Sequence, residues 1–435
     1  MTEPTEQAAT PAAPSNSYRL VVMGLLFLVY AFNFLDRQII SILAIPIQAE
    51  LDLSDRQLGL LGGIAFALLY STLGVPIAWL ADRSNRTWII TAALTVWSGF
   101  TVLCGFAQNF GQLFLARVGV GVGEAGGVAP SYSLIADYFP PKSRARALAF
   151  YSLGIPIGSA FGVIVGSQIA GGAISDSLDW RTAFIVVGVA GIVLAPIFRL
   201  VVREPARGQL DTVKLDQTAK KPSFGQVLGV LSKKPSFWLL TLGASCSSMM
   251  GYGVFFWLPS FFARSFELNI IETGWLFGSV LFFGGTIGII LGGVMGDLMA
   301  KRGVSAYARV PAIAFALTTP LYIAGVMAPN AIMAVALFMV PTALGLAWLG
   351  PTLSAFQHLV PASMRTTASA IFLLINNLLG IGGGVYVLGE LSTLLTPTFG
   401  TEALRYSIVI GSLMYLVASA LFFIAAPRLK KDWEG

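Results

Sequence analysis

Residues 20–45 read LVVMGLLFLVYAFNFLDRQIISILAI, a nearly unbroken apolar stretch that contains two adjacent charges, Asp36 and Arg37. An α-helix rises 1.5 Å per residue, so about 20 apolar residues cross the roughly 30 Å hydrocarbon core of a bilayer. This stretch is therefore long enough to span a membrane. Stretches of similar length recur along the whole chain, which predicts a polytopic membrane protein.

We predict six spans in each half of the chain. In the first half they cover residues 20–45, 58–81, 87–107, 113–135, 145–171 and 182–202. In the second half they cover residues 236–262, 273–299, 308–327, 331–359, 366–391 and 404–426. The composition agrees, since 56% of residues are hydrophobic and 11% are charged, with a mean hydropathy of +0.77. A soluble chain of 435 residues could not shield so much apolar surface from water.

The net charge of +6 is a topology signal and does not indicate nucleic-acid binding. One set of connections is acidic or neutral and contains Glu50, Asp52, Asp176 and Glu267. The alternate set, with the central linker and the carboxyl-terminal tail, is basic: Arg83, Arg86, Lys142, Arg144, Arg146, Arg203, Arg207, Lys214, Lys220, Lys221, Lys233, Lys234, Lys301, Arg302, Arg365, Arg428, Lys430 and Lys431. The positive-inside rule then predicts a multi-pass protein of the cell membrane with both termini in the cytoplasm.

The two halves of the chain contain similar short motifs at equivalent positions. Pro140-Pro-Lys-Ser-Arg144 precedes the fifth span, and Pro361-Ala-Ser-Met-Arg365 precedes the eleventh. We predict an all-α membrane protein in which twelve transmembrane helices form two pseudo-symmetric six-helix bundles, with the solute site between them. The expected parts are a disordered cytoplasmic tail (1–17), an N-terminal bundle (18–203), a cytoplasmic linker (204–234), a C-terminal bundle (235–427) and a cytoplasmic tail (428–435).

Two motifs carry a family resemblance. Ala78-Trp-Leu-Ala-Asp82-Arg83-Ser-Asn-Arg86 resembles the loop motif G-x-L-A-D-R-x-G-R-R of the major facilitator superfamily, and Gly154-Ile-Pro156-Ile-Gly158 resembles its glycine–proline helix motif. The resemblance implies the major facilitator fold and transport by alternating access.

The loop motif also predicts a conformational latch on the cytoplasmic side. We expect Asp82 to accept hydrogen bonds from the N-terminus of a neighbouring helix. The second half keeps Asp297 but has Leu298 where an arginine is expected, which predicts a weaker latch there. The predicted latch residues are Asp82, Arg83, Arg86, Arg144, Asp297 and Arg365. Alternatively, these charges serve only to set the topology.

Two further stretches narrow the resemblance to one family. Asn33-Phe-Leu-Asp36-Arg37 and Arg117-Val-Gly-Val-Gly-Val-Gly-Glu124-Ala, the latter followed by Ala-Pro, resemble patterns of Spinster transporters. That family carries lysolipids, notably sphingosine 1-phosphate and lysophospholipids, and is generally described as proton-coupled. A related pattern occurs in the anion:cation symporters of sugar acids, so a carrier of small organic anions is the alternative.

The four charges in these two stretches lie inside predicted spans, where each costs about 2.5–3.5 kcal/mol at the bilayer centre. Asp36, Arg37, Arg117 and Glu124 must therefore face a wet cavity or one another. Asn33 is one helical turn from Arg37 and shares its helix face. We expect Asp36, Arg37 and Arg117 to form one cluster towards the outside, with Glu124 beneath it.

We hypothesise that Arg37 and Arg117 bind the anionic head of the solute, with Asn33 beside them, because the planar guanidinium forms bidentate bonds with phosphate or carboxylate. Glu124 and Asp36 would exchange protons. Burial favours the neutral form of a carboxyl group, whereas a neighbouring arginine favours the charged form, so Glu124 is expected to be the main proton carrier. The alternative is a static lattice of ion pairs that braces the first and fourth helices.

The second half contributes no charge within residues 236–262 or 331–357. In the second half, Tyr252 of span 236–262 and Asn376 of span 366–391 offer hydrogen bonds and are predicted to bind the solute. Apolar area comes from large aromatic side chains: Phe256, Trp257, Phe338 and Trp348. A cavity with one charged and one apolar wall suits an amphipathic lysolipid better than a sugar acid.

Other classes of function are disfavoured. Gly121-Val-Gly123-Glu-Ala-Gly126 matches G-x-G-x-x-G, but it lies inside a span, so we predict close helix packing and no dinucleotide site. There is no nucleophile–base pair, metal-ligand cluster or phosphate-binding loop, and His358 is the only histidine. We expect no enzyme activity, cofactor, metal or nucleic-acid partner. The expected partners are the small-molecule or lysolipid substrate, protons and membrane lipid, bound by a monomer.

Overall fold

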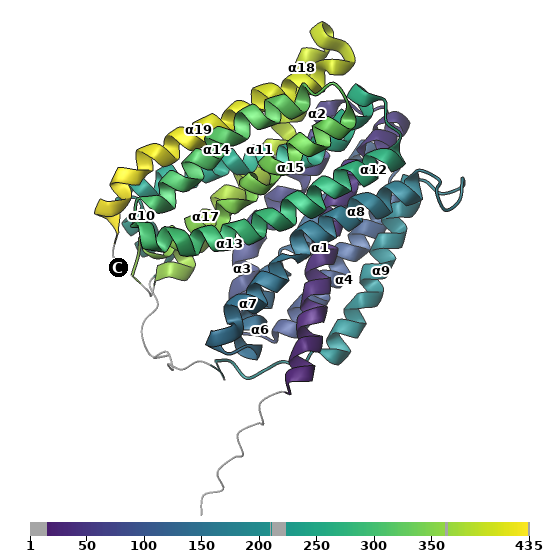
Figure 1. The fold of residues 1–435 in the computed structure, drawn as a ribbon. Helices are drawn as coiled ribbons and strands as arrows, with labels where there is room; N and C mark the ends of the chain where they lie inside the picture. The colour runs from purple at the N-terminus through teal and green to yellow at the C-terminus, as the bar shows by residue number, and fades with distance from the viewer. Residues whose placement is uncertain (1–14, 209, 211–222, 362–363, 434–435) are drawn as a thin grey trace, which may run out of the picture.

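The computed structural model describes residues 15–208, 210, 223–361 and 364–433, and within these ranges it consists of helices joined by short loops. Figure 1 shows the helices running side by side in one bundle, with both ends of the described chain at the same end of it. We call this the terminal end and the opposite one the far end. Helices of the two halves converge at the far end and diverge towards the terminal end (Figure 1).

The first half of the chain makes six passes between these ends. Its helices are α1 (Asn16–Leu51); α2 (Asp55–Gly59), the π-helix η1 (Leu60–Ile64) and α3 (Ala65–Ala81); α4 (Arg86–Gly105); α5 (Phe110–Glu124) and α6 (Val128–Tyr138); α7 (Pro141–Ser152) and α8 (Gly154–Ala170); and α9 (Trp180–Val201).

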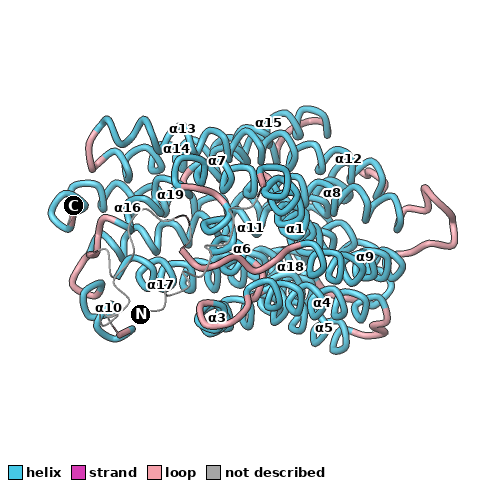
Figure 2. The backbone as a smooth tube through the Cα atoms, turned by 90° about the horizontal axis from the view of Figure 1, so that it is seen from below, coloured by secondary structure: helices cyan, strands magenta, loops and turns pink. Residues whose placement is uncertain are grey.

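The second half repeats the arrangement. Its helices are α11 (Pro235–Phe266); α12 (Ile270–Ser279), η2 (Val280–Gly284) and α13 (Gly285–Arg302); α14 (Ala306–Val326); α15 (Ala331–Ala347) and α16 (Leu349–Gln357); α17 (Arg365–Asn377), η4 (Leu378–Gly383) and α18 (Gly384–Phe399); and, after the short turn η5 (Gly400–Glu402), α19 (Ala403–Asp432). Figure 2, seen from below, shows the helical tubes packed across the whole bundle.

Length and hydropathy alone identify 10 membrane-spanning candidates among the described residues. The candidate Thr367–Asp432 contains two passes, because the chain reverses at Gly400, which has a positive φ of 53°. The pass formed by α5 and α6 is not among the 10, since its two helices are separately short, at 15 and 11 residues. With both corrections the described chain makes twelve passes, and the predicted fold class is confirmed.

The connecting segments differ in detail from the sequence-based expectations. Helix α1 begins at Asn16, capped by Ser15, and the rest of the predicted 1–17 tail lies outside the described residues. The predicted linker, 204–234, contains a short helix, α10 (Phe224–Leu231), whereas residues 209 and 211–222 lie outside the description. Helix α19 continues to Asp432, past the predicted end of the C-terminal bundle at residue 427.

Glycines allow the helices that carry the buried charges to approach closely. A Cβ atom on Gly158 of α8 would lie 2.1 Å from the carbonyl oxygen of Ala31 on α1. A Cβ on Gly121 of α5 would lie 2.4 Å from the carbonyl oxygen of Phe66 on α3, and one on Gly123 would lie 2.4 Å from the backbone nitrogen of Trp97 on α4. The predicted role of these glycines in close helix packing is confirmed, and it holds α5 firmly against α3 and α4.

Candidate functional site

The four predicted intramembrane charges meet in two crossed ion pairs between α1 and α5. Arg37 Nε donates to Glu124 Oε2 at 2.5 Å, and Arg117 Nη1 donates to Asp36 Oδ1 at 3.3 Å. Asp36, Arg117 and Glu124 are buried, with Glu124 fully inaccessible, and Arg37 is 11% exposed. Both pairs therefore lie inside the protein and away from lipid.

This pairing differs from the expected grouping of Asp36, Arg37 and Arg117 with Glu124 beneath them. Consecutive helical residues point about 100° apart. Asp36 therefore faces Arg117, while Arg37 extends towards Glu124, two turns further along α5. Each arginine is neutralised by a carboxylate of the other helix, which removes most of the cost of burying four separate charges.

Both oxygens of the Asp36 carboxylate have partners. Oδ1 accepts from Arg117, and Oδ2 accepts from the hydroxyl of Thr101 on α4. The carboxylate thus ties α1, α4 and α5 together. A buried carboxylate with this many bonds is well suited to bracing the helices.

The Glu124 carboxylate, in contrast, has spare bonding capacity. Its Oε1 atom is buried without a hydrogen-bond partner among the described residues, as are both amide atoms of Asn33 and the hydroxyl of Ser71. The guanidinium of Arg37 lies 4.3 Å from the ring centre of Tyr70, next in sequence to Ser71. Buried polar atoms normally have partners, so the unpaired atoms of Glu124 and Asn33 are candidates to bind a solute, water or a proton.

The second half of the chain contributes to this site through α11. Tyr252 is half-buried and close enough to Arg37 for an electrostatic interaction. Asn376 on α17 is instead hydrogen-bonded within its own half, where its Oδ1 accepts from Ser248 Oγ at 3.0 Å. Of the two polar residues predicted there, the structure brings Tyr252 to the charged cluster and pairs Asn376 with another residue.

The aromatic residues predicted to form an apolar wall pack mainly between helices. Trp257 Nε1 donates to the carbonyl oxygen of Val385 at 2.8 Å, and Phe338 packs edge-on against Phe261 and Phe262. Trp257 and Phe338 are both fully buried. These two rings therefore stabilise the C-terminal bundle and do not form part of the predicted solute-binding wall.

Ion pairs and hydrogen bonds join the two halves at the far end. Arg264 on α11 forms a bidentate pair with Asp55 on α2, at 2.7 and 2.6 Å. Asp55 also accepts from the hydroxyl of Ser392 on α18 at 2.6 Å, and Arg56 donates to Glu390 at 2.6 Å. We call Asp55, Arg264 and Ser392 the far-end gate.

Sequence reasoning missed the role of this gate, although a signal was present. The far end is predominantly acidic, and each arginine found there has an acidic partner: Arg56 with Glu390, Arg181 with Glu50, Arg264 with Asp55 and Arg405 with Glu402. An arginine in an otherwise acidic loop therefore indicates an ion pair. Which acid it pairs with depends on tertiary packing.

At the terminal end, Arg86 forms the centre of a buried network. Its guanidinium donates to Asp137 on α6, to Ser133 at 2.7 Å and to Glu204, at the start of the predicted linker, at 2.6 Å. Arg86 is 1% exposed. This network fastens the start of the linker to the N-terminal bundle.

The other predicted latch residues are arranged differently. Asp82 is exposed, and among the described residues no helix N-terminus donates to its carboxylate; Arg83 is exposed and stacks on Trp79 at 4.0 Å. Arg144 donates to the carbonyl oxygen of Ala136 at 2.6 Å. Arg365 is half-buried at the first position of α17, and the side chain of Asp297 lies outside the described residues.

We predict that Arg86→Gln lowers the stability of the protein by about 3 kcal/mol, because it removes the cation from a buried, negatively charged network. The thermal midpoint in detergent measures this effect. Arg83→Gln is the matched control: that side chain is exposed, and its replacement should change stability by no more than about 0.5 kcal/mol. Equal midpoints for the two variants would contradict the assignment.

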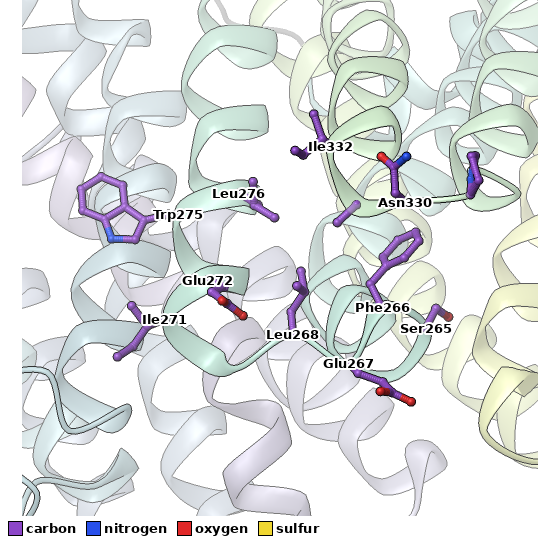
Figure 3. Close-up of a pocket in the computed structure, with 12 residues that line it drawn as sticks. Ser265, Phe266, Glu267, Leu268, Ile271, Glu272, Trp275, Leu276, Asn330 and Ile332 are labelled. Carbon is purple, nitrogen blue, oxygen red and sulfur yellow. The ribbon is translucent and has the colours of Figure 1, made fainter.

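A surface pocket of about 860 Å³ lies elsewhere, at the far end of the second half (Figure 3). The end of α11 and the starts of α12 and α15 line it, including Trp275 and Ile332. The carboxylate of Glu272 in this pocket accepts from the backbone N–H of Asn269 in a capping box. None of the four intramembrane charges lines this pocket, so it is separate from the candidate site.

Comparison with known proteins decides the family. Residues 26–385 match the sequence profile of the Major Facilitator Superfamily. The chain belongs to this superfamily. An MFS-type efflux pump of Mycolicibacterium smegmatis is 32% identical to it over 411 residues, which cover 94% of this chain and 93% of the pump. Protein spinster homolog 1 of Xenopus tropicalis is 27% identical, over 96% of this chain and 82% of that protein.

Solved structures of the superfamily agree. The crystal structure of a bacterial homologue of the human lysosomal transporter Spinster, in an inward-facing and unoccupied conformation, superposes with a TM-score of 0.87. It is 31% identical in sequence and covers 97% of this chain. A crystal structure described as a bacterial homologue of Spinster in an inward-facing and occupied conformation gives a TM-score of 0.82, at 31% identity over 97% of this chain. The predicted resemblance to Spinster proteins is confirmed: the chain is a multi-pass membrane transporter of the Spinster type and not an enzyme.

Proposed function

We propose that this transporter moves an amphipathic lysolipid with an anionic head, similar to sphingosine 1-phosphate or a lysophospholipid, by proton-coupled alternating access. The observation that carries the proposal is the buried pair of Arg37 and Glu124, whose carboxylate keeps one oxygen unpaired. This pair lies beside Asn33, whose amide is also unpaired, and near Tyr252 of the other half.

The coupling follows from competition for Arg37. A phosphate or carboxylate head that binds the guanidinium as a bidentate ligand displaces Glu124. Glu124 is fully buried, and an uncompensated carboxylate in such a site is costly, so it takes up a proton when it loses Arg37. Binding of the anionic solute and binding of the proton are then linked. Charge in the site stays balanced through the cycle.

In this mechanism Asp36 and Arg117 mainly hold the helices in position. Because both oxygens of Asp36 are already bonded, the pair is better suited to positioning α1 and α5 than to releasing a ligand. Arg117, two turns nearer the start of α5 than Glu124, contributes positive potential towards the solute head. Asp36 acts as a secondary proton site.

A carrier of small organic anions, such as sugar acids, is the second candidate. It is favoured by the packing of Trp257 and Phe338 between helices, which leaves less apolar area for a lipid chain. The hydrogen-bonded pair of Ser248 and Asn376 supplies polar groups in the second half, as a sugar acid requires. Both candidates use the same Arg37–Glu124 chemistry.

The charge distribution supports a cytoplasmic terminal end in the cell membrane. Arginines at the far end are neutralised in ion pairs, whereas Arg83, Arg146, Arg428, Lys430 and Lys431 at the terminal end are exposed. Exposed basic residues favour the cytoplasmic side. In this orientation, we propose that the predicted latch residues act on the cytoplasmic side and the far-end gate closes the outer side.

Purified protein in liposomes with an imposed pH gradient tests the function. We expect uptake of labelled lysolipid to depend on the gradient, and Glu124→Gln to abolish that dependence because glutamine cannot exchange a proton. Glu272→Gln, which alters a carboxylate in a far-end helix cap, is the control and should preserve it. Uptake of labelled sugar acid alone would select the second candidate. A Glu124→Gln protein that is less stable but still pH-dependent would indicate a static ion-pair lattice.

A further inference from the structure

The short helix α10 presents an apolar face that the protein only partly covers. Phe224, Val227, Leu228 and Leu231 follow i, i+3, i+4, i+7 spacing and lie on one side of the helix. Val227 and Leu231 are fully buried, whereas Phe224 is 51% and Leu228 37% exposed. One flank of the apolar face therefore packs on the protein, and the other faces outward.

The connection between α10 and the spanning helix α11 is fastened to the end of another spanning helix, α19. It ends at Leu231, and the spanning helix α11 begins at Pro235. In the connection, Lys234 Nζ donates to the carbonyl oxygen of Asp432 at the end of α19, at 2.9 Å. Figures 1 and 2 both show α10 at the periphery of the molecule, near the carboxyl terminus.

Exposed basic side chains lie close in sequence to the contact between Lys234 and Asp432 that joins the end of α10 to the end of α19. Lys233 directly follows α10, and Arg428, Lys430 and Lys431 lie in the last turns of α19. Among the described residues of this stretch, the acidic Asp432 accepts from the backbone N–H of Ser236 at Oδ2, at 3.0 Å. This end of the molecule therefore carries an exposed apolar flank on α10 and four exposed cations on the neighbouring segments.

We propose that α10 and these four basic residues form a docking surface for anionic phospholipid in the leaflet at the terminal end. Phe224 and Leu228 insert between the headgroups and the acyl chains, as an interfacial amphipathic helix does. Lys233, Arg428, Lys430 and Lys431 bind the phosphates, and basic residues next to a spanning helix attract anionic lipid in this way. The surface is independent of the transported solute.

This contact also bears on the alternating-access machinery. Helix α10 packs against α17, and α17 in turn packs against α3 of the other half. Anionic lipid bound at α10 is therefore one helix away from α17, which contacts the other half. We therefore expect the lipid composition of this leaflet to affect how readily the two halves separate at the terminal end.

The test uses the full chain with Cys246 replaced by alanine and one cysteine introduced for an environment-sensitive fluorophore. Cys104 is buried and is retained. Leu228→Cys places the label on the apolar flank, and Gly229→Cys is the matched control, about 100° around the helix at a position where a Cβ meets open space. The vesicles contain phosphatidylcholine and phosphatidylglycerol, with one or the other brominated to quench the fluorophore.

We expect brominated lipid to quench the label at residue 228 at least about twofold more than the label at residue 229. Brominated phosphatidylglycerol should quench more than brominated phosphatidylcholine, and this preference should fall about two- to fivefold in Lys430→Gln/Lys431→Gln or in 1 M salt. Equal quenching at the two positions would overturn the insertion. Equal quenching by the two lipids would overturn the anionic preference. If neither brominated lipid quenched the label at residue 228, the label would be in water, and the apolar flank would instead fit a soluble protein partner.

Discussion

Arg37→Ala is expected to reduce transport by at least about a hundredfold, because it removes the cation that pairs with the fully buried Glu124. Breaking one side of a buried ion pair costs about 3–5 kcal/mol, since the remaining charge has no compensation. The same change removes the guanidinium proposed to bind the solute head. Initial uptake rates in proteoliposomes, corrected for the amount of folded protein, measure the effect.

Two further variants separate loss of folding from loss of binding. Arg37→Ala/Glu124→Gln removes both charges, so it should recover most of the thermal stability while remaining inactive. Arg37→Lys keeps the charge but lacks the planar fork, so it should fold and transport poorly. If the double variant regained transport along with stability, Arg37 would be a structural residue and the proposed solute site would be wrong.

Arg264→Gln is expected to open the far end of the molecule. The variant loses the bidentate pair with Asp55 and leaves that buried carboxylate bonded only to uncharged partners. Charge-assisted bidentate bonds of this kind contribute about 2–3 kcal/mol, which corresponds to a shift of roughly 30- to 150-fold in the equilibrium between closed and open far ends. Spin labels at the exposed residues Ala173 and Thr401, one in each half, report this shift as a longer distance in pulsed electron resonance.

The control for this experiment is Arg405→Gln. Arg405 pairs with Glu402 at 2.7 Å in the same turn and does not bridge the halves. Its replacement should leave the distance distribution unchanged. Asp55→Asn should reproduce the effect of Arg264→Gln, and an unaltered distance in both gate variants would show that helix packing alone closes the far end.

Much of the candidate site was predictable from local sequence. Charged residues inside apolar spans are costly, so Asp36, Arg37, Arg117 and Glu124 stood out without any structure. Glycine spacing in the fourth span predicted the close packing of α5, because a side chain at Gly121 would collide with neighbouring backbone. The free-energy cost of burying a charge and the size of a side chain are properties of single residues. They do not depend on the tertiary arrangement.

Partner choice was not predictable in the same way. The sequence did not indicate that Arg37 pairs with Glu124 and Asp36 with Arg117, or that Asn376 bonds to Ser248. Pairing depends on the rotation and axial offset of two helices that are distant in the chain. A change of one residue in register turns a side chain by about 100° and presents it to a different neighbour.

By itself, the sequence determined that this chain crosses a membrane many times, that basic residues mark one end of it, and that opposite charges lie buried in its first half. Those conclusions follow from transfer free energies, which belong to each residue and its immediate neighbours. Only the tertiary structure decided which charges neutralise each other, that Arg264 joins the halves at the far end, and that Asp82 remains exposed. The ion pairs join residues 81 to 209 positions apart in the chain, so small rotations of distant helices decide which atoms meet.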